Sequence, residues 1–518
     1  MRSLLVFVFL WFSYSAASQT GIPTDSTRKI SFLYTNDLHA HLEPHRVPWI
    51  SEHRLVGGFA NIATLVRQQK TADSNTLYFD AGDYFTGPSF SSLTKGAAII
   101  DVMNHLSLDA ACIGNHEFDH GWQNVPLQLK AARFPVLNGN VFIKKSGKLL
   151  WNNPYKIITM NGIRIAVIGL HGRFAFYDTI AEEMIQGVEA RDEEQLLKEY
   201  IRKLQDQADL IVLLVHQGIP GRQSTSGNKD VARNLQRDIE LAQRVPGIDI
   251  MITGHAHQGT PQPLVSNGTL IVSTDALGTE LGKLEITYNK QTDKISTYRN
   301  TLNYLFDDEV PDDSVTVTVI NKWKQKINEI TNEPVTVIHK PLTRSYGEES
   351  VMGNMVTDAM MSAFPGYDLA VTNSGGLRQD IDTGIVTVGE IISAFPFPNT
   401  IHIVRLRGDS LLSLFEHGAS LTNGILQVSK GVELAYDERK PVGARIGYCR
   451  INGRELDPDK IYGVLTSNFL ADGGDGFGAF KQPVSRKKTG IEIVQTMIRY
   501  LKKFRVYEPA LGSRIKKI

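Results

Sequence analysis

Side chains of the kinds that bind metal ions follow a series of apolar runs in the first half of the chain. They are Asp37 and His39, Asp80 and Asp83, Asn115, His116 and Asp119, His216, and His255 and His257. Carboxylate, amide and imidazole groups without thiolate suit zinc, manganese, iron or cobalt and exclude a sulfur-bound cluster. Taken singly, each residue is more simply a cap or a turn former. Their joint occurrence indicates a site.

The apolar runs that precede these residues have the composition of buried strands. The runs at 29–35, 76–82, 109–114, 164–170, 209–216, 249–254 and 269–274 are short and rich in Val, Ile and Leu. Helical periodicity at 57–70 and 193–207 separates some of them. Strands that alternate with helices predict an α/β layered domain, in which ligands bind beyond the carboxyl ends of the strands.

The number of candidate ligands points to two ions. Seven of these ten side chains as ligands would exceed what one tetrahedral ion accepts, but they suit two ions that share a bridging carboxylate. Such a pair clamps the attacking and leaving oxygens of an in-line displacement and lowers the pKa of a bridging water toward about 7. Phosphate ester hydrolysis is the reaction that most needs this help, because its uncatalysed rate is extremely low.

The second half of the chain has a different pattern. Acidic residues and Pro311 open a connector that continues as an expected helix near 315–332 and ends at Pro334. From about residue 335, apolar runs at 367–373, 401–408, 430–437 and 461–468 predict strands. Residues 352–364 and 408–419 have helical periodicity. We therefore predict a second, smaller α/β domain.

Length and charge restrict the classes of function. A chain of 518 residues predicts two domains. The chain has 55 Lys and Arg against 55 Asp and Glu, so bulk charge gives no signal for nucleic acid or a membrane surface. Cys112 and Cys449 lie far apart, in different predicted domains, and we expect no disulfide between them.

The N-terminal residues resemble an export signal. A basic start is followed by a short apolar run at 4–12 and by small residues that suit cleavage near Ser18 and Gln19. We expect a signal peptide at 1–18 and a periplasmic or extracellular protein; an uncleaved N-terminal anchor is the alternative. No other run is long enough to span a bilayer, and the last residues are polar, so we expect no stable membrane anchor.

Eight stretches of this sequence resemble the signature blocks of one enzyme family. Five are NDLHAH (36–41), DAGDYFTG (80–87), GNHEFDHG (114–121), VLLVHQG (212–218) and ITGHAHQG (252–259). Three more are NSGGLRQDI (373–381), FPFPNT (395–400) and SNFLADGGDGF (467–477). The first five resemble calcineurin-like metallophosphoesterases. All eight together resemble the 5'-nucleotidase family, which includes bacterial periplasmic UDP-sugar hydrolases and animal ecto-5'-nucleotidases.

The resemblance implies a fold and a division of the chain. The implied first domain, at 28–306, has four layers in the order α/β/β/α. A linker helix at 307–334 follows, and a C-terminal nucleotide-binding domain occupies 335–518. Metals in one domain and nucleotide in the other imply a cleft between them. By analogy with the family, we expect the domains to rotate about the linker helix and close bound nucleotide onto the metals.

The resemblance also assigns metal ligands. It implies that Asp37, His39 and His257 bind the first ion, that Asp83 bridges the two ions, and that the second ion is held by Asn115, His216 and His255. Family members vary at the position of His257. The implied cofactors are two divalent ions, zinc or manganese foremost, with cobalt, iron and magnesium as alternatives.

His116 and Asp119 resemble the family's catalytic pair. At a spacing of i and i+3 in a helical turn they lie on one face, so Asp119 can orient the imidazole and favour its protonated form. A cationic His116 would stabilise charge on the phosphoryl group or the leaving oxygen. We interpret Glu117 and His120 as structural.

The second domain offers groups that suit a nucleotide. Arginine binds phosphate oxygens, glycines allow close backbone approach, loop aromatics stack on bases, and a carboxylate accepts from ribose hydroxyls. On sequence alone, Phe397 is equally a core residue, Arg378 a surface ion pair and Asp475 a turn former. The resemblance implies substrate contacts for Arg344, Asn373, Gly375, Arg378, Phe397, Asn399, Phe469 and Asp475. The segment around Arg344 is longer than in the relatives considered.

Together these observations predict an exported phosphohydrolase that cleaves nucleoside 5'-monophosphates to nucleoside and phosphate, through in-line attack by a metal-bridging hydroxide. The alternatives within enzymes are a UDP-sugar or dinucleotide pyrophosphatase and a 2',3'-cyclic phosphodiesterase with 3'-nucleotidase activity. A non-catalytic nucleotide-binding protein is the alternative from another class. The sequence leaves the native metal, the base preference and the oligomeric state open.

Overall fold

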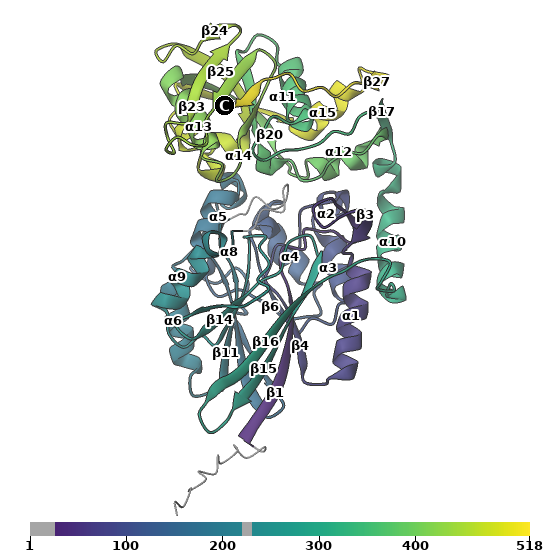
Figure 1. The fold of residues 1–518 in the computed structure, drawn as a ribbon, viewed down its shortest axis with the longest axis vertical. Coiled ribbons are helices and arrows are strands. Elements are labelled where there is room, and N and C mark those ends of the chain that lie inside the picture. The colour runs from purple at the N-terminus through teal and green to yellow at the C-terminus, as the bar shows by residue number, and fades with distance from the viewer. Residues whose placement is uncertain (1–25, 220–229) are drawn as a thin grey trace, which may run out of the picture.

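The computed structural model describes residues 26–219 and 230–518. The predicted signal peptide at 1–18 lies outside the described residues. Figure 1 shows an elongated molecule whose N-terminal half lies below its C-terminal half, with the long helix α10 (Ser314–Thr331) along one side. No helix among the described residues is long and apolar enough to cross a membrane.

Two six-stranded sheets form the centre of the N-terminal half. The first has the order β16 (Lys294–Tyr304), β15 (Glu280–Asn289), β1 (Thr27–Thr35), β4 (Thr76–Asp80), β5 (Ala110–Cys112) and β6 (Val136–Leu137). The second has the order β13 (Leu264–Ser266), β14 (Thr269–Val272), β12 (Ile250–Gly254), β11 (Leu210–His216), β9 (Ile163–His171) and β8 (Tyr155–Met160). Strands β1, β4, β5 and β6 are parallel, as are β9, β11, β12 and β14.

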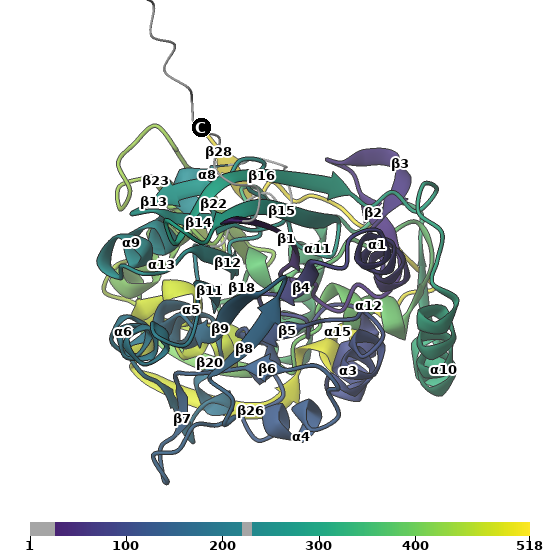
Figure 2. The same cartoon turned by 90° about the horizontal axis from the view of Figure 1, so that it is seen from below.

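Helices cover the outer face of each sheet, which gives the expected four layers in the order α/β/β/α (Figure 2). Phe32 and Phe79 of the first sheet pack against Val212 and Ile252 of the second in the core between the sheets. The outer face of the first sheet is covered by α1 (Phe59–Ala72) and α3 (Ala97–Met103), and that of the second by α6 (Glu193–Leu204) and α9 (Gln236–Arg244). Strands buried on both faces read as continuous apolar runs, which is why the sequence revealed them.

The C-terminal half is built on a five-stranded sheet. Its order is β21 (Leu426–Val428), β18 (Leu369–Asn373), β25 (Ile461–Ser467), β20 (Thr400–Arg407) and β26 (Ser485–Glu492). One face packs against α11 (Val351–Ala363), α12 (Val388–Ala394) and α15 (Ile493–Leu501), and the other against α13 (Gly408–Ala419). Alternate residues of a strand serve the two cores: Ala370 faces the first core, and Leu369 and Val371 face the second.

Two smaller sheets complete this half. One has the order β24 (Arg454–Glu455), β23 (Ile446–Ile451), β22 (Val432–Tyr436) and β28 (Ile515–Lys517). The other has the order β19 (Gly384–Thr387), β17 (Pro334–Ile338) and β27 (Val506–Tyr507), and it follows α10 directly.

Helix α10 belongs physically to the N-terminal half. Asp313 caps it by accepting from the Thr316 N–H at 2.9 Å, and Ile320 and Ile327 are buried in the core that α1 and α3 cover. The Trp323 indole donates to Asp101 at 2.9 Å. The expected helix near 315–332 is therefore present, and it ends where the C-terminal half begins.

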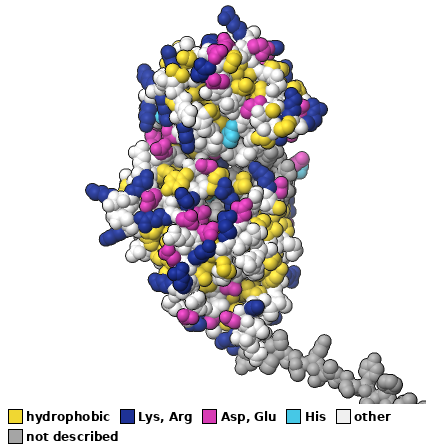
Figure 3. Space-filling model, turned by 90° about the vertical axis from the view of Figure 1, so that its left-hand side faces the viewer, with side chains coloured by type: hydrophobic (Ala, Val, Ile, Leu, Met, Phe, Trp, Pro, Cys, Tyr) yellow, Lys and Arg dark blue, Asp and Glu magenta, His cyan; other side chains and the backbone are white. Residues whose placement is uncertain are grey.

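Two features expected from composition are also present. Cys112 and Cys449 are both free and buried. On the face that Figure 3 shows, Lys and Arg are interspersed with Asp and Glu over both halves, without a large area of a single sign.

Candidate metal centre and nucleotide cavity

The strand ends of both sheets meet at one place in the N-terminal half. The loop after β1 carries Asp37 and His39, and its backbone is tied to the loop after β4: the Asp37 N–H donates to the Gly82 carbonyl and the His39 N–H to the Asp83 carbonyl, both at 2.9 Å. From the second sheet, His216 ends β11 and His255 follows β12. The sheet edges thus bring distant residues together.

One cluster of ligand-type atoms consists of Asp37, His39 and His257. The Nε2 atoms of His39 and His257 lie 2.9 Å apart. Oδ1 of Asp37 lies 3.5 Å from Nε2 of His257 and 3.8 Å from Nε2 of His39. All three side chains point their ligand atoms at one point.

A second cluster consists of Asp83, His216 and His255. Nε2 of His216 lies 2.9 Å from Oδ2 of Asp83 and 3.1 Å from Oδ1 of Asn115. Asp83 also groups with His39 and His116, so its carboxylate lies between the two clusters. Nε2 of His255 is buried and has no hydrogen-bond partner among the described residues. A buried orphan nitrogen of this kind fits a cation.

Backbone carbonyls fix which imidazole nitrogen faces the centre. Nδ1 of His39 lies 3.1 Å from the Thr86 carbonyl, and Nδ1 of His216 lies 2.8 Å from the Ala81 carbonyl. A carbonyl only accepts, so Nδ1 carries the proton, and in the neutral imidazole Nε2 keeps its lone pair. Burial, followed by the nearby Arg378, holds the pKa of His39 and of His257 well below the ordinary value. Neutral imidazole is the form that binds metal.

The backbone at five of the predicted ligands is strained. Asp37, His39, Asp83, His255 and His257 have φ values of 52°, 45°, 61°, 76° and 51°. Non-glycine residues rarely adopt this left-handed region, and such strain gathers at functional sites. Five of the seven predicted ligands share this conformation, which agrees with a functional site.

Glycine is required where two of these loops touch. A Cβ at Gly114 would lie 2.2 Å from Oδ1 of Asp83, and a Cβ at Gly254 would lie 2.8 Å from Nδ1 of His216. Both contacts are shorter than real Cβ contacts, so these glycines allow the loops to close around the ligand atoms.

The stretch after Gly114 separates two roles. A short 3₁₀ turn, η2 (His116–Phe118), places Nδ1 of His116 2.7 Å from Oδ2 of Asp119, while Asn115 turns toward His216. Burial opposes charge on the imidazole, but Asp119 and then Asp83 outweigh it and raise the pKa of His116. His116 is therefore arranged to carry a proton.

Glu117 holds the loops together. Its carboxylate accepts from the backbone N–H groups of Gly114 at 2.6 Å, Phe85 at 2.9 Å and Asp83 at 3.1 Å. Neither Glu117 nor His120 lines the adjacent cavity.

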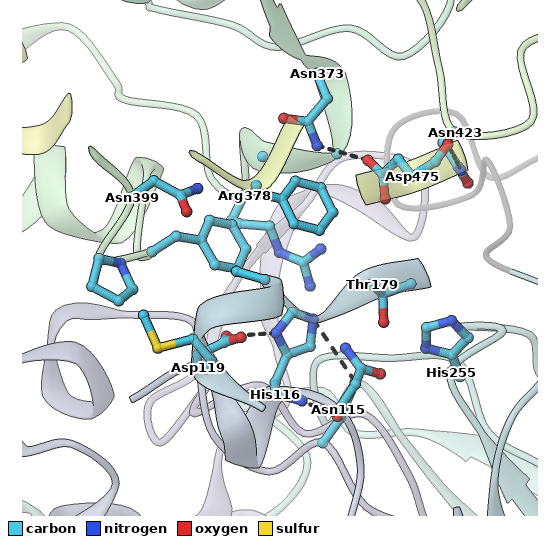
Figure 4. A pocket seen from close by; sticks show the side chains of 18 of the residues that line it. Asn115, His116, Asp119, Thr179, His255, Asn373, Arg378, Asn399, Asn423 and Asp475 are labelled. Carbon is cyan, nitrogen blue, oxygen red and sulfur yellow. Dashed lines mark hydrogen bonds and ion pairs between the residues drawn. The ribbon is translucent and has the colours of Figure 1, made fainter. Parts of the chain in front are cut away.

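A cavity of about 100 Å³ lies between the two halves. Six predicted residues of the N-terminal half line it: Asp83, Asn115, His116, Asp119, His255 and His257. Seven predicted residues of the C-terminal half line it: Asn373, Gly375, Arg378, Phe397, Asn399, Phe469 and Asp475. Figure 4 shows Arg378 pointing toward His116 and Asn373 beside Asp475. The cavity therefore lies between the clusters of ligand-type atoms and the loops of the C-terminal half.

Arg378 and Phe397 reach the N-terminal half directly. Nη2 of Arg378 lies 3.2 Å from Nε2 of His39. The Phe397 ring lies 5.7 Å from the His116 ring, at an interplanar angle of 37°. An anion held by Arg378 would therefore lie against the ligand cluster.

Asp475 is held from several sides. Its Oδ2 accepts from the Asn373 amide at 2.7 Å, and its carbonyl lies 2.8 Å from Nε2 of His417 and accepts from Asn423 at 2.9 Å. Its φ is 55°. Burial raises its pKa to about 6.

Arg344 is the one predicted substrate residue that does not line the cavity. Its guanidinium donates to the carbonyl of Arg378 at 2.5 Å, and its backbone N–H donates to Asp380 at 2.9 Å. It therefore lies behind Arg378, and its direct phosphate contact stays a prediction.

Seven cavity residues were not predicted: Thr179, Ala181, Met184, Tyr346, Gly376, Pro398 and Asn423. Pro398 and Gly376 adjoin predicted residues, so the neighbouring motifs were a usable signal. Thr179, Ala181 and Met184 come from α5 (Arg173–Thr179) and the turn after it, and no pattern in the sequence marks them.

Comparison with known proteins agrees with this architecture. Residues 30–259 match the family described as calcineurin-like phosphoesterase, and residues 327–482 match the 5'-nucleotidase C-terminal domain. The chain is 28% identical to the 5'-nucleotidase of Homo sapiens, covering 95% of this chain and 92% of that protein. It is 27% identical to the snake venom 5'-nucleotidase of Naja atra, covering 94% of this chain and 98% of that protein.

A solved structure is similar over almost the whole chain. The 5'-nucleotidase precursor of Thermus thermophilus superposes with a TM-score of 0.81 at 27% identity, covering 95% of this chain and 99% of that chain. The two matched regions occur in this order along the chain, and the cavity lies between them. The chain belongs to the 5'-nucleotidase family of calcineurin-like metallophosphoesterases, which are hydrolases of phosphoric ester bonds.

Proposed function

We propose that this protein is a metal-dependent 5'-nucleotidase that releases phosphate from nucleoside 5'-monophosphates. One observation carries the proposal: a single cavity is lined both by the ligand-type cluster and by two aromatic side chains with a carboxylate, Phe397, Phe469 and Asp475. The first set suits a phosphate and the second a nucleoside.

The candidate ligands are Asp37, His39 and His257 for one ion and Asn115, His216 and His255 for the other, with Asp83 between them. Their carboxylate, amide and imidazole groups fit zinc or manganese, with cobalt, iron and magnesium as alternatives. When bound, two such ions would supply Lewis acidity and a water of lowered pKa.

The remaining steps are assigned to side chains of the chain itself. Arg378 binds and orients the phosphate oxygens. Protonated His116, held by Asp119 at 2.7 Å, stabilises the charge that develops and passes its proton to the leaving oxygen. Phe397 and Phe469 stack on the base, while Asn373 orients Asp475 toward the ribose. These site roles, and the domain limits at 28–306 and 335–518, are part of the proposal.

We also propose that the protein is exported. The basic and apolar residues at the N-terminus support this, as does the similarity to a snake venom protein. Mass spectrometry of protein secreted from its natural host would show a new N-terminus near Gln19; an intact Met1 on the cell-associated protein would favour the uncleaved anchor.

A hydrolysis panel tests the activity. It compares AMP, ADP, UDP-glucose, 2',3'-cyclic AMP and 3'-AMP, each with and without a chelator and with several divalent ions added back. We expect phosphate release from AMP to exceed that from the other substrates and to disappear with the chelator. Preferred hydrolysis of UDP-glucose or cyclic AMP would support the other enzyme classes, and nucleotide binding without hydrolysis would support a non-catalytic protein.

A further inference from the structure

Three polar atoms from three separate segments surround the space above Gly375. A Cβ built on Gly375 would lie 3.2 Å from the Tyr346 hydroxyl, 3.6 Å from Oδ2 of Asp475 and 3.7 Å from Nδ2 of Asn373. Gly375 lines the cavity, and so do these three residues. Because Gly375 has no side chain, nothing on this residue covers the two oxygens and the nitrogen where they gather at the cavity.

The segment that carries Tyr346 is fixed by its backbone. The Tyr346 carbonyl accepts from the Ile425 N–H at 2.8 Å, and the carbonyl of Gly347 accepts from the Tyr436 hydroxyl. The carbonyl of Glu348 accepts from the Gln427 amide at 2.8 Å. These three contacts anchor residues 346–348. The anchors of this segment lie on or beside β21 and β22, so the Tyr346 ring is presented to the cavity from a rigid support.

The Tyr346 hydroxyl is available to a ligand. It makes no hydrogen bond with any residue in the described parts of the chain, although the ring is half-buried. Burial, and after it the carboxylate of Asp475, raises the pKa of Tyr346, so the phenol stays protonated and can donate.

The chemistry of the neighbouring groups identifies what fits. An ionised Asp475 only accepts hydrogen bonds, and Tyr346 both donates and accepts. The two oxygens lie within 3.2 Å and 3.6 Å of one point, so a pair of adjacent hydroxyls can reach both. A hydroxyl both donates and accepts, so it can pair with either oxygen, whereas an anion would be repelled by Asp475.

We propose that Tyr346 is a specificity-determining residue of the sugar subsite, where its hydroxyl contacts one hydroxyl of the ribose diol while Asp475 accepts from the other. This inference rests on the proposed function for the identity of the ligand. It makes the protein selective for ribonucleosides over deoxyribonucleosides, because removing the contacted hydroxyl leaves the phenol without its partner.

The test combines a protein variant that lacks the Tyr346 hydroxyl with nucleosides that each lack one sugar hydroxyl. Calorimetry measures the binding of adenosine, 2'-deoxyadenosine and 3'-deoxyadenosine to the wild type and to Tyr346→Phe. We expect Tyr346→Phe to weaken adenosine binding by roughly threefold to tenfold, the worth of one hydrogen bond. For one of the two deoxynucleosides the substitution should change binding by less than about twofold, because the partner hydroxyl is already gone.

A matched control separates recognition from anchoring. Tyr436→Phe also removes a phenolic hydroxyl, one that holds the same segment through Gly347, and Tyr436 does not line the cavity. It should weaken all three nucleosides by the same factor. Equal weakening of all three ligands by Tyr346→Phe, or no weakening of any, would overturn the proposal, as would a wild type that binds none of them. Hydrolysis of AMP by the wild type is measured separately, so failure of the sugar contact is distinguishable from failure of the nucleotidase activity.

Discussion

The two walls of the cavity are built in different ways. On the N-terminal side, Asp37, His39, Asp83, His216 and His255 follow parallel strands, are almost fully buried and lie within hydrogen-bond or ion-pair distance of one another. On the C-terminal side, the predicted substrate residues come from separate loops, and seven of the eight are only partly buried.

This difference indicates a division of labour. The wall of strand ends is held in place by backbone hydrogen bonds between its loops, as expected for a site that binds small ions in a fixed geometry. The side chains of the loop wall are more exposed, as expected for groups that gain partners from a substrate. Changes on the first wall should therefore reduce the rate of the chemical step, and changes on the second should reduce affinity.

The largest expected effect on catalysis comes from a substitution on the wall of strand ends. His116→Ala should lower kcat for AMP by about 10²–10⁴-fold, the usual worth of a positioned acid, and leave KM little changed. Metal content should stay the same because His116 is not among the proposed ligands. His120→Ala is the matched control, since His120 lies four residues on but does not line the cavity. A kcat for His116→Ala within a few fold of the wild type would remove its proposed role.

Substitution of the two arginines should separate a direct contact from a supporting one. Arg378→Ala should lower kcat/KM for AMP by roughly 10–150-fold, because hydrogen bonds to charged groups contribute about 1.5–3 kcal/mol. Arg344→Ala should cost less than about tenfold, since Arg344 acts by donating to the carbonyl of Arg378 at 2.5 Å. Steady-state kinetics of both variants decide the matter. An equal or larger loss for Arg344→Ala would restore the direct phosphate contact expected from sequence.

The aromatic pair tests the loop wall itself. Phe397→Leu and Phe469→Leu should each raise KM for AMP by about 5–100-fold at nearly constant kcat, since stacking contributes about 1–3 kcal/mol per base. The proposed difference between the two walls requires that these substitutions change KM and leave kcat nearly constant. If either substitution lowered kcat as strongly as His116→Ala, the loops would be part of the chemical machinery, not only of the binding surface.

The smallest effect concerns pH and Asp475. Because burial raises its pKa to about 6, this carboxyl is mostly ionised at pH 7.5 and mostly protonated at pH 5. The protonated form loses an acceptor, so adenosine binding should weaken several-fold as pH falls through about 6. Calorimetry from pH 5 to 7.5 measures the effect, and Asp475→Asn should flatten it. A profile unchanged by that substitution would assign the dependence to another group.

The sequence predicted the site best where a physical rule connects the place of a residue at a strand end with its role as a ligand. Because parallel strands present their ends at one edge, Asp37, Asp83 and His216 could be grouped from sequence although 179 residues separate the first from the last. A second rule indicated the layered α/β domain: strands buried on both faces leave continuous apolar runs in the sequence. The interpretation of Glu117 as structural agrees with its three backbone partners.

The loop wall was less accessible to such reasoning. Four residues reach the cavity only because segments far apart in sequence pack beside it: Tyr346, Asn423, Thr179 and Met184. No periodicity in the sequence predicts that packing. For Arg344 the resemblance implied a phosphate contact, which stays a prediction, while its guanidinium donates to the carbonyl of Arg378 at 2.5 Å. Residue type alone does not reveal which side of a loop faces a ligand.

The central claim is that the strand-end cluster holds a pair of divalent ions, and metal stoichiometry tests it most directly. Purified protein is stripped with a chelator, dialysed against zinc or manganese and analysed by inductively coupled plasma mass spectrometry. The account predicts about two ions per chain for the wild type and fewer for Asp83→Ala, whose carboxylate lies between the two clusters. A wild type that retains no ion, or an Asp83→Ala variant with the wild-type content, would contradict it.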